Sequence, residues 1–191
     1  KRAEFMLEMF RQSGLSRLET DSAGNVFACI PGEGAGAPLV VSAHLDTVFP
    51  AGTNLAIRRE AGRIYGPGIG DNSTGLAGLL GLAAMLKEKK VSLPGDLWLA
   101  ANTGEEGLGD LKGMKAVCRR FGDSPILYLV LEGMALGHIY HRAIGVRRYK
   151  ITCHTRGGHS WTDFGNPSAI HELARLVTAI AGLNPPESPR T

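Results

Sequence analysis

A histidine and an aspartate two positions apart directly follow an apolar run and could bind a metal. Residues 38–41 have the pattern of a buried strand, and His44 and Asp46 come just after them. Side chains two apart on an extended segment point the same way, so the Asp46 carboxylate would lie behind the His44 ring and fix its tautomer. The other ring nitrogen would then be available to a cation. Taken alone, such a histidine is more often a packed or surface residue than a ligand.

Carboxylates follow other predicted elements in the same way. Asp71 stands at the start of a predicted helix, Glu105 and Glu106 follow one apolar run, and Glu132 follows another. Ligands of open α/β sheets collect at the carboxyl ends of strands, so we expect these side chains to converge with His44. Several carboxylates brought together repel one another unless a cation lies among them.

The donor types favour a transition metal. Carboxylate oxygens mixed with imidazole suit zinc, cobalt or manganese better than calcium or a thiolate site. One metal could use His44, Asp71 and Glu132, and a second could use Glu106 and the other oxygen of Asp71, about 3.5–4 Å away. Such a pair would acidify a water and polarise a carbonyl. Glu105 would remain free to act as a general base.

The elements that must position these residues alternate between helices and apolar strands. Strands are predicted at 17–20, 25–30, 38–46, 96–102 and 126–131, and helices at 3–14, 71–90 and 111–120. This alternation predicts an α/β fold with a mainly parallel sheet flanked by helices.

The pattern changes from about residue 145. Residues 146–154 alternate like an antiparallel strand, and residues 167–181 are helical with one apolar face. We therefore predict an incomplete catalytic metal-binding domain at 1–144 and the beginning of an α+β lid or dimerisation domain at 145–191. A strand and a helix cannot close a core by themselves, so we expect the sequence to be a piece of a longer chain.

Composition and charge argue against several classes of protein. The chain is 43% hydrophobic and 20% charged, as is usual for globular proteins. Its formal charge of +3 is too small to indicate nucleic acid or membrane surfaces as partners. The glycines of 31–38 lack the helix start and Lys-Ser/Thr pair of a phosphate-binding loop. Three cysteines without metal-type spacing fit a reducing compartment, so we expect a cytoplasmic protein.

Five motifs follow one another along the chain. They are Ser-Ala-His-Leu-Asp-Thr-Val (42–48), Gly-Pro-Gly-Ile-Gly-Asp-Asn (66–72), Thr-Gly-Glu-Glu-Gly (103–107), Leu-Glu-Gly (131–133) and Gly-Gly-His-Ser (157–160). In this order they resemble the motifs of the co-catalytic zinc metallopeptidase family that includes carboxypeptidase G, peptidase T and the aminoacylases. The resemblance covers almost the whole chain.

The resemblance implies a role for each site residue. The implied metal ligands, for two zinc ions with cobalt or manganese as substitutes, are His44, Asp71, Glu106 and Glu132. Asp71 would bridge the two ions, Asp46 would orient His44, and Glu105 would be the general base. The resemblance also implies a non-proline cis peptide bond after Asp71.

The resemblance further implies a homodimer. In the family a lid domain carries the dimer contact. A lid histidine from the partner subunit reaches the active site and stabilises the oxyanion. His159 lies in the Gly-Gly-His-Ser motif that carries this histidine. Family members complete the second metal site with a histidine after the lid. His154 and His171 match no ligand motif, so we expect this last ligand beyond Thr191 and weak binding of the second metal without it.

The leading hypothesis is a metal-dependent hydrolase of peptide or N-acyl amide bonds that acts as an exopeptidase. One alternative is an amidohydrolase of non-peptide N-acyl or N-carbamoyl amino acids, which would use the same metal site. Another is a non-catalytic metal-binding, peptide-binding or dimerisation module. Glu105 argues against such a module because a pure binder does not need a base, whereas the missing last histidine argues for it.

Overall fold

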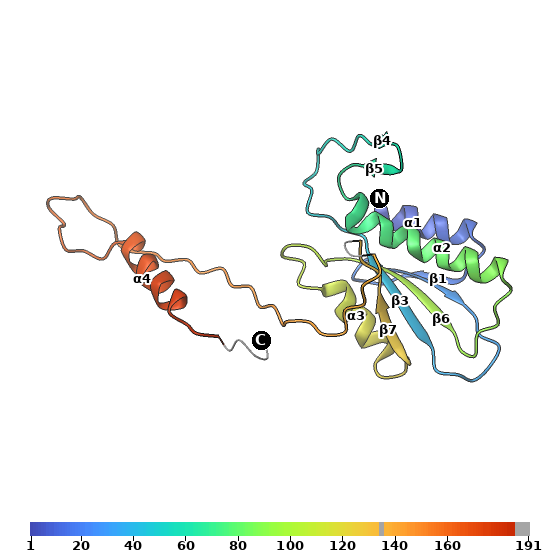
Figure 1. Cartoon of the computed structure of the whole chain (residues 1–191). Helices are drawn as coiled ribbons and strands as arrows, with labels where there is room; N and C mark the ends of the chain where they lie inside the picture. The colour runs from blue at the N-terminus through green and yellow to red at the C-terminus, as the bar shows by residue number, and fades with distance from the viewer. Residues whose placement is uncertain (134–135, 186–191) are drawn as a thin grey trace. The chain divides into compact units, whose positions relative to one another are not determined.

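A computed structural model describes residues 1–133 and 136–185 of the chain (Figure 1). The chain divides into two units, Lys1–His138 and Ile139–Thr191. The predicted domain boundary at 144/145 stays a prediction, and residues 186–191 of the predicted second domain lie outside the described residues.

The first unit is built on a five-stranded sheet with the order β1-β2-β6-β3-β7. The strands are β1 (Ser16–Thr20), β2 (Val26–Ile30), β3 (Leu39–His44), β6 (Leu97–Asn102) and β7 (Leu127–Val130). β3 pairs in parallel with β6 and β7, whereas β2 pairs antiparallel with β1 and β6. The predicted α/β fold is confirmed, and the sheet is mixed because β2 alone runs against the other strands. A short turn joins β1 to β2, which only an antiparallel pair permits.

Helices cover both faces of the sheet (Figure 1). They are α1 (Arg2–Gln12), α2 (Thr74–Glu88) and α3 (Lys112–Phe121). Because strand side chains alternate, Val41 packs in one cluster with Phe10 of α1 and Leu79 of α2, while Val40 packs in the other with Val117 of α3. No helix within residues 1–133 and 136–185 has the length and apolar character to cross a membrane.

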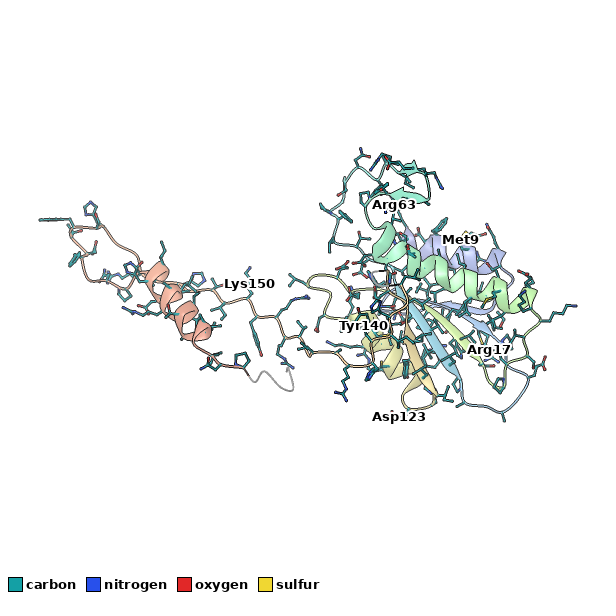
Figure 2. The ribbon with its side chains drawn as sticks, in the orientation of Figure 1. Met9, Arg17, Arg63, Asp123, Tyr140 and Lys150 are labelled. Carbon is teal, nitrogen blue, oxygen red and sulfur yellow. The ribbon has the colours of Figure 1, made fainter. Side chains whose placement is uncertain are left out.

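A small hairpin separates β3 from the next site residue. β4 (Arg58–Glu60) and β5 (Arg63–Tyr65) pair antiparallel in their own two-stranded sheet, and Arg63 marks this hairpin in Figure 2. The strands predicted from the sequence did not include these residues. Strands of three residues, all exposed, have no alternation of apolar and polar side chains by which to recognise them.

The second unit contains one described helix, α4 (Ala169–Ala181), close to the predicted bounds. Its predicted apolar face is largely exposed, with Ile170, Val177 and Ile180 each at least half accessible. The predicted strand at 146–154 is wrong, because the structure has neither helix nor strand there, and side chains such as Lys150 are exposed (Figure 2). A strand requires a neighbouring strand for its backbone hydrogen bonds, and neither sheet of the described residues includes this segment.

Candidate metal centre

The carboxyl ends of three parallel strands bring the predicted ligands together. His44 ends β3, Glu106 follows β6, and Glu132 lies two residues past β7. Asp71 comes from η1 (Ile69–Ser73), an irregular turn that leads into α2. Because parallel strands end at the same edge of a sheet, residues far apart in the sequence meet here.

Two groups of side chains could each hold a cation. The donor atoms of His44, Asp71 and Glu132 all lie within 4.8 Å of one another, as do those of His44, Glu105 and Glu106. The first group is the set predicted for the first metal. Glu106 also lies near enough to Asp71 for the two charges to interact.

The buried His44 ring is held in one tautomer. Its Nδ1 atom lies 2.9 Å from the backbone carbonyl oxygen of Asp46, which can only accept, so Nδ1 carries the proton. Nε2 faces carboxylate oxygens of Asp71 at 2.7 Å and Glu132 at 3.7 Å. A neutral ring would place two acceptors against each other there. The arrangement therefore requires a proton or a metal cation beside Nε2.

The contact that orients His44 differs from the predicted one. The Asp46 carboxylate lies 3.8 Å from Nδ1, and the backbone carbonyl makes the hydrogen bond instead. β3 ends at His44, so the side-chain alternation used in the prediction does not reach residue 46. The carboxylate instead accepts hydrogen bonds from the backbone N–H groups of Glu105, at 3.2 Å, and Glu106, at 2.9 Å. Asp46 thus joins the end of β3 to the loop after β6.

Asn72, which was not among the predicted site residues, joins two other ligand-bearing segments. It follows Asp71 across a cis peptide bond, as the family motif implied. Its side chain is fully buried, donates to the carbonyl of Leu131 at 2.8 Å and accepts from the backbone N–H of Gly75 at 2.9 Å. Leu131 precedes Glu132, so this amide links the turn that carries Asp71 to the segment that carries Glu132.

The glycine after Glu132 permits a close approach between the same two segments. A Cβ atom at Gly133 would lie 1.6 Å from the carbonyl oxygen of Gly70, one residue before Asp71. No side chain fits in that space. The Leu-Glu-Gly motif therefore has a packing reason for its last residue.

The massed carboxylates disfavour their own ionisation. Burial first, and then the charges of Asp71, Glu105 and Glu106, raise the pKa of Glu132, although His44 opposes the shift. Burial and then the charges of Asp71 and Glu105 raise the pKa of Glu106. A cation bound among these groups would remove this repulsion.

The predicted lid residue His159 lies in the second unit. Its Nδ1 accepts a hydrogen bond from the backbone N–H of Trp161 at 3.2 Å, and its own backbone N–H donates to Asp163 at 2.8 Å. These contacts shape a local turn. The predicted role of His159 at the metal centre stays a prediction.

Comparisons with known proteins give a consistent result. Over 180 residues the chain is 28% identical to the succinyl-diaminopimelate desuccinylase of Corynebacterium glutamicum, covering 94% of this chain and 48% of that protein. Over 109 residues it is 33% identical to carboxypeptidase G2 of Pseudomonas sp. (strain RS-16), covering 53% of this chain and 26% of that protein. The chain thus spans about half the length, or less, of these curated relatives.

A solved structure supports the fold. The aminopeptidase PepT of Bacillus cereus superimposes with a TM-score of 0.56 at 24% identity, covering 68% of this chain and 36% of that one.

The model of the peptidase family M20/M25/M40 matches residues 40–191, which include every predicted ligand and the predicted base. The chain therefore belongs to peptidase family M20/M25/M40.

Proposed function

We propose that the full-length protein is a metal-dependent hydrolase of peptide or N-acyl amide bonds and acts as an exopeptidase. The observation that carries this proposal is the buried His44 ring, whose Nε2 faces the carboxylates of Asp71 and Glu132. Membership of a peptidase family supports it independently.

The donor set fits a pair of divalent transition metals. His44, Asp71 and Glu132 would hold one ion, and Glu106 and Asp71 would hold a second. Zinc suits this mixture of imidazole and carboxylate ligands, and cobalt or manganese could replace it. When bound, such ions would polarise the scissile carbonyl and lower the pKa of a water.

Glu105 is the proposed general base. It would accept a proton from the attacking water and pass it to the leaving amine. Its backbone N–H is held by Asp46, as is that of Glu106, so the two neighbouring carboxylates can take different roles from one anchored loop. In a homodimer formed through the second unit, His159 of the partner subunit would donate to the developing oxyanion.

The names of the two curated relatives support a class of substrate. One relative is named for removing a succinyl group and the other for being a carboxypeptidase. We therefore propose peptides or N-acyl amino acids as substrates. We also propose a cytoplasmic location, which the use of cysteine in the sequence supports. A non-peptide N-acyl substrate would use the same site residues.

Glu105→Gln in the full-length protein tests this function. We expect hydrolysis of a panel of dipeptides and N-acyl amino acids to fall about 100-fold or more, as for loss of a general base, while the zinc content measured by mass spectrometry stays the same. Glu88→Gln at the exposed end of α2 is the matched control and should retain full activity. Near-normal turnover of Glu105→Gln with normal zinc content would contradict the assignment. Zinc binding by the wild type without any hydrolysis would favour the non-catalytic module.

A further inference from the structure

The side chain of Asn25 is fully buried and makes hydrogen bonds to its own turn and to two distant segments of the chain. It lies between β1 and β2, and its Nδ2 donates to the Asp21 carboxylate at 2.8 Å and to the carbonyl of Gly113 at 3.0 Å. Its Oδ1 accepts from the backbone N–H of Thr103 at 3.0 Å. Two acceptors beside Nδ2 and a donor beside Oδ1 leave one possible orientation for the amide.

The turn around Asn25 is itself fixed. The Asp21 carboxylate accepts from the backbone N–H groups of Ala23 and Asn25, both at 2.9 Å, and Asp21 donates its own N–H to the carbonyl of Asn25. The Thr103 hydroxyl adds a bond to the carbonyl of Ala23 at 2.7 Å. Asn25 is therefore a rigid support for what it binds.

What Asn25 binds is the start of the loop that carries Glu105. Thr103 is the first residue after β6, and Glu105 lies two positions further on. Gly113, in the first turn of α3, closes the loop at its other end, where its N–H donates to the carbonyl of Thr103 at 2.9 Å. A Cβ atom at Gly113 would lie 2.5 Å from Asn25 Oδ1, so only glycine admits this approach.

Between Thr103 and Gly113 the loop also makes a hydrogen bond within itself, because the Gly109 N–H donates to the carbonyl of Glu106 at 2.9 Å. No strand or helix covers residues 103–111, and the Asp46 carboxylate holds the backbone of Glu105 and Glu106 from the β3 side. Asn25 at the start and Asp46 in the middle therefore anchor the segment that carries Glu105 to β2 and β3. A donor atom of Glu105 lies within 4.8 Å of one of His44. A shift of the Thr103 backbone would move the Glu105 carboxylate away from that position.

We propose that Asn25 is a positioning residue for the Glu105–Glu106 loop. This inference rests on the proposed function for its effect on turnover, and on the structure alone for its effect on the loop. Asn25 touches neither the predicted ligands nor the predicted base through its side chain, and it acts through Thr103. Because a misplacement of about 1 Å can cost about 100-fold in rate, Asn25→Ala should lower kcat by about that factor. KM should stay the same, since no substrate contact is removed.

The first experiment needs no activity. Hydrogen exchange of the zinc-free full-length protein is measured by mass spectrometry on peptides covering residues 103–109. In Asn25→Ala the N–H groups of Glu105 and Glu106 should exchange at least about 10-fold faster, while peptides from β3 and α2 stay unchanged. Val117→Ala is the matched control, because it removes buried apolar atoms from α3 without touching a bond to Thr103.

The second experiment compares kcat and KM for the same variants on the substrate panel, with Asn25→Asp added as a variant of nearly equal size. The carboxylate that this substitution introduces could accept from Thr103 but could donate neither to Gly113 nor to Asp21, so the loop should still loosen. This variant serves if Asn25→Ala does not fold. Exchange in residues 103–109 no faster than in Val117→Ala would overturn the inference. If the wild type hydrolyses nothing, the proposed function fails, and the exchange result still decides the role of Asn25.

Discussion

Zinc should stabilise the folded protein through His44, and the size of the effect can be worked out from the site. His44, Asp71 and Glu132 come from three separate segments that meet only in the folded chain. The ion would therefore bind the native state and not the unfolded one. At a free concentration of about 100 times its Kd it should add about 2.7 kcal/mol to the free energy of unfolding.

This stabilisation has a measurable thermal signature. For a chain of this size, about 1 kcal/mol corresponds to roughly 2–4 °C in Tm, so zinc should raise the Tm by about 5–11 °C. Differential scanning calorimetry at about pH 7.5, with EDTA for the zinc-free sample, measures the difference. In His44→Ala the rise should fall below about 2 °C, because two carboxylates alone bind zinc weakly. Subtracting the zinc-free Tm of each variant removes the packing cost of the mutation itself.

His141→Ala is the matched control, because His141 is exposed and lies in the second unit. It should keep the full rise in Tm. An equal rise in His44→Ala and the wild type would refute the reasoning, since zinc would then bind elsewhere.

Three further outcomes are expected. Asp46→Asn replaces one carboxylate oxygen with an NH2 group that faces a backbone N–H, so the free energy of unfolding measured in urea should fall by about 1–3 kcal/mol. An unchanged free energy of unfolding would contradict the anchoring role of Asp46. The pKa values of Glu106 and Glu132 are raised, so protons compete with zinc for these carboxylates as the pH falls, and protonation also relieves the repulsion in the metal-free fold. The zinc-induced rise in Tm should therefore be smaller at about pH 5.5 than at about pH 7.5. A larger rise at the lower pH would argue against this site. Burial raises the pKa of Cys29 to about 11, so a disulfide reagent at about pH 8 should modify the exposed Cys118 and leave Cys29 unmodified until the protein unfolds, as peptide mapping would show.

The strands that hold the site could be predicted because their residues are apolar on both faces. Val40 and Val41 are both buried, one under each helical layer, and such runs are typical of parallel strands. Once the strands are placed, the convergence of His44, Glu106 and Glu132 follows from their position at the strand ends. The strand predicted at 146–154 is absent from the structure. Alternating apolar and polar side chains indicate that a segment could form a strand, but not that a neighbouring strand is available to it.

The contacts that fix the ligands could not be predicted in this way. Asn25 and Gly113 are 88 positions apart, and nothing in either residue type points to the other. Asn25 follows a glycine in a turn, where asparagine is expected for local backbone reasons alone. The Asp46 carboxylate was assigned to the ring because the strand was assumed to continue. The carboxylate lies 3.8 Å from His44 Nδ1, and its hydrogen bonds come from backbone N–H groups, which no sequence pattern distinguishes.

The buried side chains of Asn25 and Asn72 hold the shape of the site independently of its state of charge. Asn25 and Asn72 bind backbone carbonyl and N–H groups at Thr103, Gly113 and Leu131, and none of these backbone groups titrates in water. The carboxylates can gain or lose protons, or exchange them for a metal, while these amide bonds keep the loop ends where they are. The metal-free protein would then already hold its ligand-bearing backbone in the arrangement that binding requires, so loading the ion would cost little rearrangement of the chain.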